Sequence, residues 1–418
     1  MQSNEPIKTF IINLQRRTER KAHILAEFSG KEEFSLTVIE ACEHPRGYIG
    51  LWNSIIKIIK GLSESSDEYV LICEDDHQFT DSYTKEGLFR SIQEARHRQA
   101  DILCGGISWC RNALQLTDSL FWIDSNFSGT QFIVLFRKFL PILMTATLAE
   151  SETPDLKFCS LTDNIFLIHP FISIQKEFGY SDATMPNNTP GHVENLFRTA
   201  DTSIGHVRQI RQHYKILQQE MEKEPDDSID DDVLISTYII VHPERGQWKR
   251  RVLDQFKEKK EFEITVIEAP HHDPGEWMSI RRAIEMAMDN DDDAIIICMD
   301  RHEFTVHYSK ELLFRNISLA HAKGSGYLLG GVDDFGAAIP VSSNLFWIDT
   351  CTGGQFTVIF RAAFDRILNT AVNEHSPMNN ALFSLNSSRL LLYPFLSAPS
   401  SQESSNRLES LSRHQYVW

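Results

Sequence analysis

Three carboxylates stand in a row at Glu74, Asp75 and Asp76, directly after the apolar run of residues 69–73. Like charges at contact distance raise one another's pKa, so such a triplet at the end of a buried strand needs a cationic partner. A hard divalent cation such as Mn²⁺ or Mg²⁺ suits an all-oxygen site and in turn holds a diphosphate. Glu74 and Asp76 project to the same side of an extended segment, so we expect them to contact the cation or a nucleotide, with Asp75 as the near alternative. In isolation the triplet also fits a solvated acidic turn.

Strand and helix signals alternate along the first part of the chain and position this triplet. Short β-rich runs occupy residues 9–14, 36–39 and 68–73, and helical patterns occupy residues 16–28 and 52–61. This alternation predicts an α/β fold with a mostly parallel sheet covered by helices on both faces. Ligands bind at the carboxyl ends of the strands in such sheets, which is where the triplet falls.

The sequence repeats itself over the length of a domain. Four segments return at nearly constant spacing: residues 36–41 as 264–269, 73–80 as 298–305, 103–106 as 328–331 and 121–124 as 346–349. Matches in one order and register indicate duplication of a complete domain. The chain is therefore predicted to hold two tandem Rossmann-like domains.

The length of 418 residues exceeds what one hydrophobic core usually serves. We predict a first domain at residues 1–192, a helical connector and acidic hinge at 193–232, a second domain at 233–397 and a disordered tail at 398–418. Apolar residues of the connector, from Val193 to Met221, recur at gaps of about three and four. They fit packing on the connector's own domain or the seam of a homodimer, and both alternatives stay open.

Composition narrows the partners and the compartment. The net charge of −17, with no dense Lys/Arg block, argues against nucleic acid as a partner. Seven cysteines without paired metal-ligand spacing indicate reduced thiols. No apolar run approaches the roughly 18 residues of a membrane span, and the first ten residues lack a signal-peptide pattern. We expect a cytoplasmic protein.

Five motifs together resemble the family 25 glycosyltransferases, the lipooligosaccharide and collagen galactosyltransferase group. They occupy residues 10–20 (FIINLQRRTER), 47–54 (GYIGLWNS), 69–76 (YVLICEDD), 161–166 (LTDNIF) and 169–182. The second motif departs from the family pattern, because the family's usual His after Ser54 is Ile55 here. The resemblance covers about residues 7–185 and, more weakly, residues 234–397.

The resemblance implies a GT-A fold, a UDP-sugar donor, Mn²⁺ or a similar cation, and inversion of the anomeric configuration. It ranks UDP-galactose first as donor, then UDP-glucose, then UDP-N-acetylglucosamine. The acceptor would be a hydroxyl of a glycan, a lipid-linked saccharide or a peptide.

The resemblance also assigns candidate roles to single residues. Asp163 matches the family's downstream Asp, and an inverting transfer needs a base for the acceptor's proton. A hydrogen bond to a sugar, or a helix N-cap after Thr162, are its alternatives. His169 would complete the metal shell, although a His before Pro is often structural.

Further candidate residues would bind the donor. Arg forks suit phosphates, and surface arginines on the first helix are the alternative. The predicted donor-binding residues are Asn13, Arg17, Arg20, Gly50, Ser54 and Asp182. Trp109, Trp122 and Phe127 suit stacking on an acceptor sugar or, as aromatics on strand-like runs, the core.

The second copy has lost the polar residues of the first. Met299, Asp300 and Arg301 replace the carboxylate triplet, Ser387 stands where Asp163 stood, and Val241 replaces Asn13. Apolar strand residues persist, so we expect a folded but inactive second domain.

Three rival functions remain. A non-catalytic module would bind a nucleotide sugar or glycan without turnover. A nucleotidyltransferase usually needs a Gly-rich phosphate loop with a basic residue, which the sequence does not provide convincingly. A carboxylate-pair glycoside hydrolase would use Asp163 with one of the strand-end acids.

Overall fold

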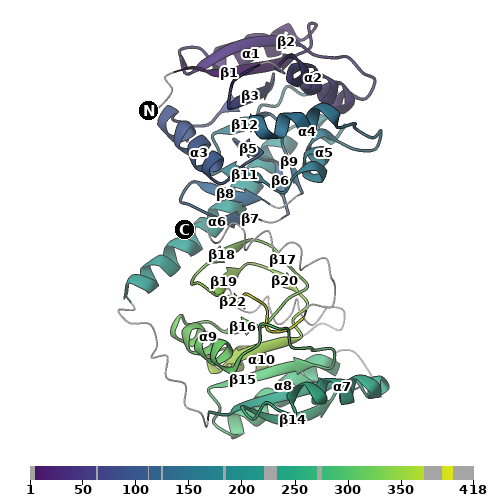
Figure 1. Cartoon of the computed structure of the whole chain (residues 1–418), viewed down its shortest axis with the longest axis vertical. Coiled ribbons are helices and arrows are strands. Elements are labelled where there is room, and N and C mark those ends of the chain that lie inside the picture. Colours follow the sequence, from purple (N-terminus) through teal and green to yellow (C-terminus); the bar gives the residue numbers. More distant parts are fainter. Residues whose placement is uncertain are drawn as a thin grey trace. The chain divides into compact units, whose positions relative to one another are not determined.

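The computed structural model describes residues 5–62, 65–111, 113–123, 126–181, 185–220, 233–270, 275–370 and 388–398, without the side chains of 185, 218–220 and 245. The described residues form two compact units, unit 1 up to Arg208 and unit 2 from Gln209 onward (Figure 1). Predicted features that fall outside the described residues are Asp182, Ser387, the acidic hinge and, apart from Ala398, the tail.

Unit 1 alternates strands and helices, as the sequence predicts. Its elements are β1 (Ile7–Asn13), α1 (Thr18–Glu27), β2 (Phe34–Glu40), α2 (Gly47–Gly61), β3 (Tyr69–Glu74), β4 (His77–Phe79), α3 (Lys85–His97), β5 (Ile102–Cys104), β6 (Trp109–Cys110), β7 (Ala113–Gln115), β8 (Leu120–Ile123), β9 (Phe127–Ser128), β10 (Phe132–Phe136), the 3₁₀ turn η1 (Arg137–Phe139), α4 (Leu140–Thr145), α5 (Pro154–Leu161), β11 (Ile165–Ile168), β12 (Ser173–Gln175), the 3₁₀ turn η2 (Met185–Asn188) and the part of α6 (His192–Glu220) up to Arg208.

The main sheet of unit 1 has the strand order β2-β1-β3-β10-β5-β11-β8-β7. Strands β1, β2, β3, β5, β7 and β11 run in one direction, and β8 and β10 run against them. The predicted α/β class with a mostly parallel sheet flanked by helices is confirmed. Residues 70–73 of β3 are buried, because a central strand is covered on both faces.

Unit 2 repeats this arrangement. Its elements are β13 (Ile235–Val241), the 3₁₀ turn η3 (Pro243–Arg245), α7 (Gly246–Phe256), β14 (Phe262–Glu268), α8 (Gly275–Asp289), β15 (Ala294–Met299), α9 (Lys310–Ala322), β16 (Tyr327–Leu329), β17 (Asp334–Phe335), β18 (Ala338–Pro340), β19 (Leu345–Ile348), β20 (Cys351–Thr352), β21 (Phe356–Phe360), α10 (Arg361–Leu368) and β22 (Arg389–Leu392). The strand order β14-β13-β15-β21-β16-β22-β19-β18 matches that of unit 1 strand for strand.

Buried polar contacts recur at matching positions of the two units. His77 Nδ1 lies 2.8 Å from Ser173 Oγ in unit 1, and His302 Nδ1 lies 2.8 Å from Ser397 Oγ in unit 2. Burial lowers the pKa of both histidines, that of His302 to about 3. These contacts do not distinguish the units, so they belong to the shared framework.

Helix α6 begins at His192, one residue before the predicted start of the connector. Its buried apolar residues include Val193, Phe197, Ile204 and Val207. Packing within the chain thus accounts for its apolar face in unit 1, and the homodimer stays a prediction. Within the described residues, no helix is both long and apolar enough to cross a membrane.

Candidate functional site

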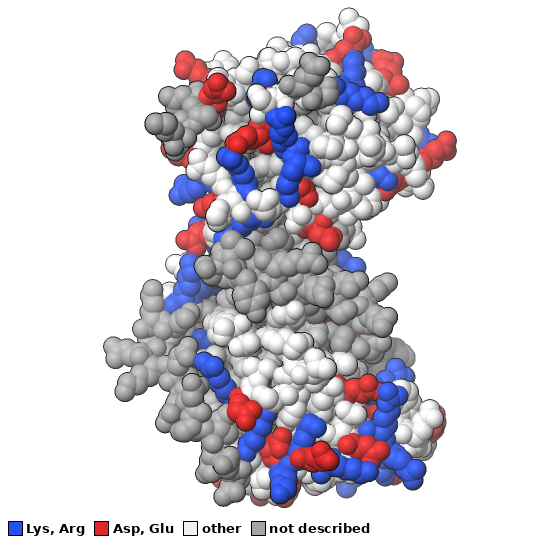
Figure 2. Space-filling view, in the orientation of Figure 1, with Lys and Arg blue, Asp and Glu red and all other residues white. Residues whose placement is uncertain are grey.

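Unit 1 contains an open cavity of about 850 Å³ at the carboxyl ends of β1 and β3. The loop after β2, the first turns of α2, α5 and α6, and the β6–β9 hairpin complete its walls. The cavity therefore lies at the sheet edge where ligands bind in α/β folds. On the face drawn in Figure 2, Lys and Arg side chains lie interspersed with Asp and Glu.

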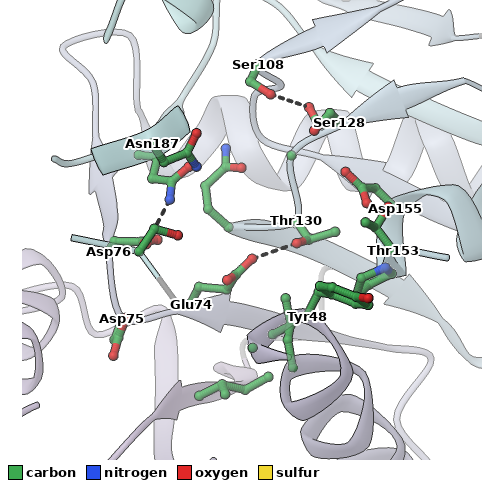
Figure 3. Close-up of a pocket in the computed structure, with 18 of the residues that line it drawn as sticks. Tyr48, Glu74, Asp75, Asp76, Ser108, Ser128, Thr130, Thr153, Asp155 and Asn187 are labelled. Atoms are coloured by element: carbon green, nitrogen blue, oxygen red, sulfur yellow. Dashed lines mark hydrogen bonds between the residues drawn. The ribbon is translucent and has the colours of Figure 1, made fainter. Parts of the chain in front are cut away.

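The carboxylate triplet lies in this cavity at the end of β3. Glu74 and Asp76 point into the space, whereas Asp75 turns the other way (Figure 3). Thr130 Oγ1 donates to Glu74 Oε1 at 2.6 Å, and Gln175 Nε2 donates to Asp76 Oδ2 at 2.9 Å. The alternation predicted for an extended segment is thus present in the structure.

Arg20 of α1 is the buried counter-charge to the triplet. Its Nη1 donates at 3.0 Å to both Asp75 Oδ1 and Asp76 Oδ2, and its Nη2 donates to the backbone oxygen of Tyr180 at 2.8 Å. Asn13 Nδ2 donates to Asp75 Oδ2 at 2.9 Å. Both oxygens of Asp75 are therefore bonded to protein groups, which argues against this residue as a cation ligand.

Burial and crowded charge shift the pKa values of these groups. Burial, and then Asp76, raise the pKa of Glu74 to about 8 despite the hydrogen bond from Thr130. Burial also raises the pKa of Asp76, although Arg20 opposes the shift. Burial alone would lower the pKa of Arg20, but Asp76 and Asp75 outweigh it and the pKa is raised. One arginine does not neutralise the cluster.

Two of the four predicted metal ligands, Glu74 and Asp76, are placed where they would hold a divalent cation. Asp76 Oδ1 is buried without a hydrogen-bond partner, and a buried orphaned oxygen is a place for a cation. Glu74 and Asp76 would hold the ion, with the remaining ligands from water and substrate phosphates, as Mg²⁺-type sites usually have. Among the described residues, no group of three or more His, Cys, Asp and Glu side chains is arranged as a metal site.

His169 does not join the carboxylates, which corrects its predicted role. The side chain is buried outside the cavity lining, and its ring meets Phe121 and Phe171 edge-on. His169 Nε2 lies 3.3 Å from Asp201 Oδ1 on α6. This histidine thus contacts α6 and lies apart from the carboxylates.

Asp163 also lies away from the cavity, and its predicted role as base there is corrected. Strand β11 runs in the direction of β3, and Asp163 precedes β11, so it lies at the opposite, amino-terminal edge of the sheet. The residue is exposed, and its backbone oxygen accepts from Trp122 Nε1 at 2.6 Å. The predicted hydrolase pair of Asp163 with a strand-end acid is likewise not assembled.

Gly50 and Ser54 lie behind the residues that line the cavity and are not part of its lining. A Cβ atom on Gly50 would lie 2.4 Å from the backbone oxygen of Cys42. Ser54 Oγ donates to Gly50 O at 2.8 Å and accepts from Cys42 N at 2.8 Å. The two residues therefore hold the loop after β2 against α2, which corrects their predicted direct contact with a donor.

The other three predicted donor residues that the structure describes do reach the cavity or its immediate support. Arg17 and Arg20 line it, and Asn13 fixes Asp75 next to it. The Arg17 guanidinium lies 5.3 Å from the ring centre of Tyr180, and that of Arg20 lies 4.8 Å from the same ring. The segment around residue 180 thus orients both arginines.

Sequence reasoning assigned no role to Asp155, Thr130 or Gln175, although Gln175 lies within the fifth motif, residues 169–182. Asp155 lies in the first turn of α5 and lines the cavity, and its charge contributes to the raised pKa of Glu74. The signal was present in the sequence, because Thr153-Pro154-Asp155 is a typical helix start. Thr130 carries no comparable signal, and the motif that contains Gln175 does not reveal its contact with Asp76, since that contact depends on the position of strand β12.

Unit 2 has different side chains at the positions that correspond to the carboxylate triplet and to Arg20. Met299 is the last residue of β15, and Oδ2 of the following residue, Asp300, accepts from the backbone N–H of His242 at 3.3 Å. Trp248, on the face of α7 that corresponds to Arg20, replaces the buried cation with an aromatic ring. Unit 2 therefore lacks the charge arrangement of unit 1.

Comparison with known proteins identifies no family. No family model and no curated protein matches the chain. Solved structures that match part of the chain include "Crystal Structure of A197 from STIV", with a TM-score of 0.30 and 10% identity over 42% of this chain and 87% of that one. UDP-glucose pyrophosphorylase is similar in its apo form (TM-score 0.28, 12% identity, 49% of this chain and 82% of that one) and with UDP-glucose (0.29, 11%, 48% and 81%). At these TM-scores the matches carry no inference about the fold or the function of this chain.

Proposed function

We propose that unit 1 is a metal-dependent, inverting glycosyltransferase that moves a hexose from a UDP-sugar to a hydroxyl acceptor. The observation that carries this proposal is the pair Glu74 and Asp76, which point into an 850 Å³ cavity while Asp76 Oδ1 is buried without a partner. The family resemblance of the sequence supports the choice of donor, with UDP-galactose ahead of UDP-glucose and UDP-N-acetylglucosamine.

The donor would bind with its diphosphate between the carboxylates and the arginines. Glu74 and Asp76 would hold a divalent cation, which would supply positive charge to offset the charge on a leaving diphosphate. Arg17, on the same wall, has the fork geometry that suits phosphate oxygens. Arg20 is committed to Asp75, Asp76 and Tyr180, so its role is to orient the carboxylates.

Asp155 is the residue we propose as general base. An inverting transfer needs a base that takes the acceptor's proton on the side of the sugar opposite the leaving group. Figure 3 shows Asp155 across the cavity from Asp76, at the start of α5.

Unit 2 is proposed to be a duplicated copy that kept its fold and lost this chemistry. Its matching strand order and buried contacts support a common origin, and Met299 and Arg301 stand where unit 1 has Glu74 and Asp76. Its role would be that of a scaffold.

A binding module without turnover is the second candidate. The observation that favours it is the close contact of Arg20 with Asp76, because an internal cation already offsets part of the charge that a metal would neutralise. Such a module would bind a UDP-sugar and release no UDP.

The experiment is an assay of UDP release from a panel of UDP-sugars with Mn²⁺, with and without saccharide and peptide acceptors. We expect acceptor-dependent release that stops when the metal is chelated. Tight UDP-sugar binding without release would favour the binding module. Equal turnover of a GDP- or CMP-sugar would contradict the proposed donor.

A further inference from the structure

A tryptophan is half exposed on the wall of the cavity. Trp109 of β6 has 47% of its surface exposed, and Leu156 of α5 has 44% exposed, and both line the cavity. Exposing a large aromatic ring to water forgoes the stabilisation that burial would give it. A ring in this position suggests a ligand that covers it.

The hairpin that carries Trp109 does not require an aromatic residue. Trp109 pairs with Ser128 in the β6–β9 ladder, and Asp334 pairs with Thr352 in the matching β17–β20 ladder of unit 2. The same two-stranded ladder therefore forms in unit 2 with an aspartate at the position of Trp109. The fold does not account for the tryptophan of unit 1.

Trp109 is present in the unit that also has the carboxylates of the cavity. The hairpin leads directly into Thr130, which donates to Glu74, and Gln131 O accepts from Glu74 N at 3.0 Å. In unit 2, Gly354 stands at the position of Thr130 and Met299 at that of Glu74. Unit 2 has thus lost the ring and the carboxylate together, as expected if both serve one ligand site.

Polar groups surround the ring at the cavity wall. Ser108, Asn126 and Ser128 line the cavity beside Trp109. Ser108 Oγ donates to Ser128 O at 3.1 Å, which holds the edge of the hairpin (Figure 3). An exposed aromatic face flanked by hydroxyl and amide groups matches a pyranose, which has an apolar C–H face and a polar rim of hydroxyls.

We propose that Trp109 is the stacking platform of an acceptor subsite that binds a neutral pyranose, so that the acceptor is a saccharide hydroxyl. This inference rests on the proposed transferase function of unit 1. It places the acceptor between the hairpin and α5, next to Asp155, which lines the same wall region as Leu156. The carboxylate of Asp155 disfavours a phosphorylated acceptor at this end of the cavity.

The test is saturation-transfer NMR on the full chain with UDP and Mn²⁺ present. The probes are methyl β-galactopyranoside, lactose and a serine amide as a stand-in for a peptide hydroxyl. We expect a pyranoside to bind, Trp109→Ala to weaken it about tenfold or more, and Trp109→Phe to keep it within about threefold because a ring remains. Ile142→Ala, which alters an exposed apolar residue of α4 away from the cavity, is the matched control and should leave binding unchanged.

UDP binding, followed separately by calorimetry, distinguishes the two levels of the proposal. Binding of UDP and serine amide without any pyranoside would overturn the inference and leave the transferase function standing. Pyranoside binding equal in Trp109→Ala and the wild type would overturn it as well. Trp109-dependent pyranoside binding in a chain that binds no UDP would support the subsite and contradict the nucleotide-sugar function.

Discussion

Arg20 Nη1 lies 3.0 Å from Asp76 Oδ2, and both side chains are buried. The contact joins the first helix of unit 1 to the end of its third strand, at the centre of the candidate site. The contact fixes the position of the Asp76 carboxylate. It also places a positive charge beside the site where the proposed function puts a metal cation.

Replacing Arg20 should therefore lower the free energy of unfolding, as a more direct effect than any change in the transfer reaction. Arg20→Leu leaves Asp75 and Asp76 without their buried cation, and removal of one partner of a buried ion pair costs about 3–5 kcal/mol. Arg16→Leu, which breaks an exposed pair with Glu43, should change stability by less than about 1 kcal/mol. Urea unfolding measures both. Equal stability of the two variants would show that the buried contact has little weight.

Cation binding should depend on pH through Glu74. Its pKa is raised from 4.5 to about 8 in the cation-free chain, so Glu74 is mostly protonated below that pH and must release a proton to bind a cation. Mn²⁺ affinity should thus rise by up to about tenfold per pH unit as the pH increases toward 8. Titration calorimetry measures this slope.

Glu74→Gln is the control for this linkage, because the amide does not titrate. The variant should bind Mn²⁺ weakly and with a flatter pH dependence. Mn²⁺ affinity of the wild type that is constant between about pH 6 and pH 8 would contradict Glu74 as a ligand.

The same shift predicts an effect on stability. A carboxyl group whose pKa is raised on folding stabilises the fold below its unfolded pKa, and this contribution is lost as the pH rises through 8. Glu74→Gln should therefore stabilise the cation-free chain at alkaline pH more than at acid pH. Thermal unfolding at both ends of this range, with a chelator present, measures the difference. A larger gain at acid pH would contradict the raised pKa.

Asp155 and Asp163 are distinguished by the edge of the sheet on which they lie. Asp155→Asn should lower sugar transfer by about a hundredfold, the usual contribution of a general base, while UDP affinity stays nearly unchanged. Asp163→Asn should leave both nearly unchanged, because the residue lies outside the cavity lining. Transfer rates and UDP binding are measured for each variant. Loss of transfer in Asp163→Asn alone would restore the base expected from the sequence motif.

Gly50 provides a packing test within one helix. Gly50→Ala would bring a Cβ atom within 2.4 Å of Cys42 O and should destabilise unit 1 by about 1–3 kcal/mol, the usual cost of overpacking. Gly61→Ala, near the end of the same helix, meets no atom within 4 Å and should be neutral or stabilising. Chemical unfolding compares the two. A stable Gly50→Ala chain with weakened UDP binding would instead indicate direct contact with the donor.

The features that follow the local sequence were predictable. The alternation of strands and helices gave the α/β class, and the apolar run into Glu74, Asp75 and Asp76 gave the edge of the sheet that carries the cavity. Two-residue periodicity also separated the two inward carboxylates from the third. Each of these depends on residues that are close in the chain.

The features that depend on strand order were not predictable. Strand β10 inserts between β3 and β5 against their direction, and this brings Thr130 to Glu74. Likewise, the motif around Asp163 suggests a catalytic acid, but the direction of β11 places it at the far edge of the sheet. Spacing along a chain does not reveal which end of a strand faces a cavity.

The central claim is that unit 1 carries metal-dependent sugar transfer through Asp76 and that unit 2 does not. The most direct measurement is sugar transfer with Mn²⁺ by folded Asp76→Asn and Arg301→Ala chains, which alter matching positions of the two units. We predict that Asp76→Asn lowers the rate by about a hundredfold or more, because a charged ligand oxygen is lost at the transition state. Arg301→Ala should transfer sugar at nearly the wild-type rate. An active Asp76→Asn chain, or a folded but inactive Arg301→Ala chain, would contradict the placement of the active site in unit 1.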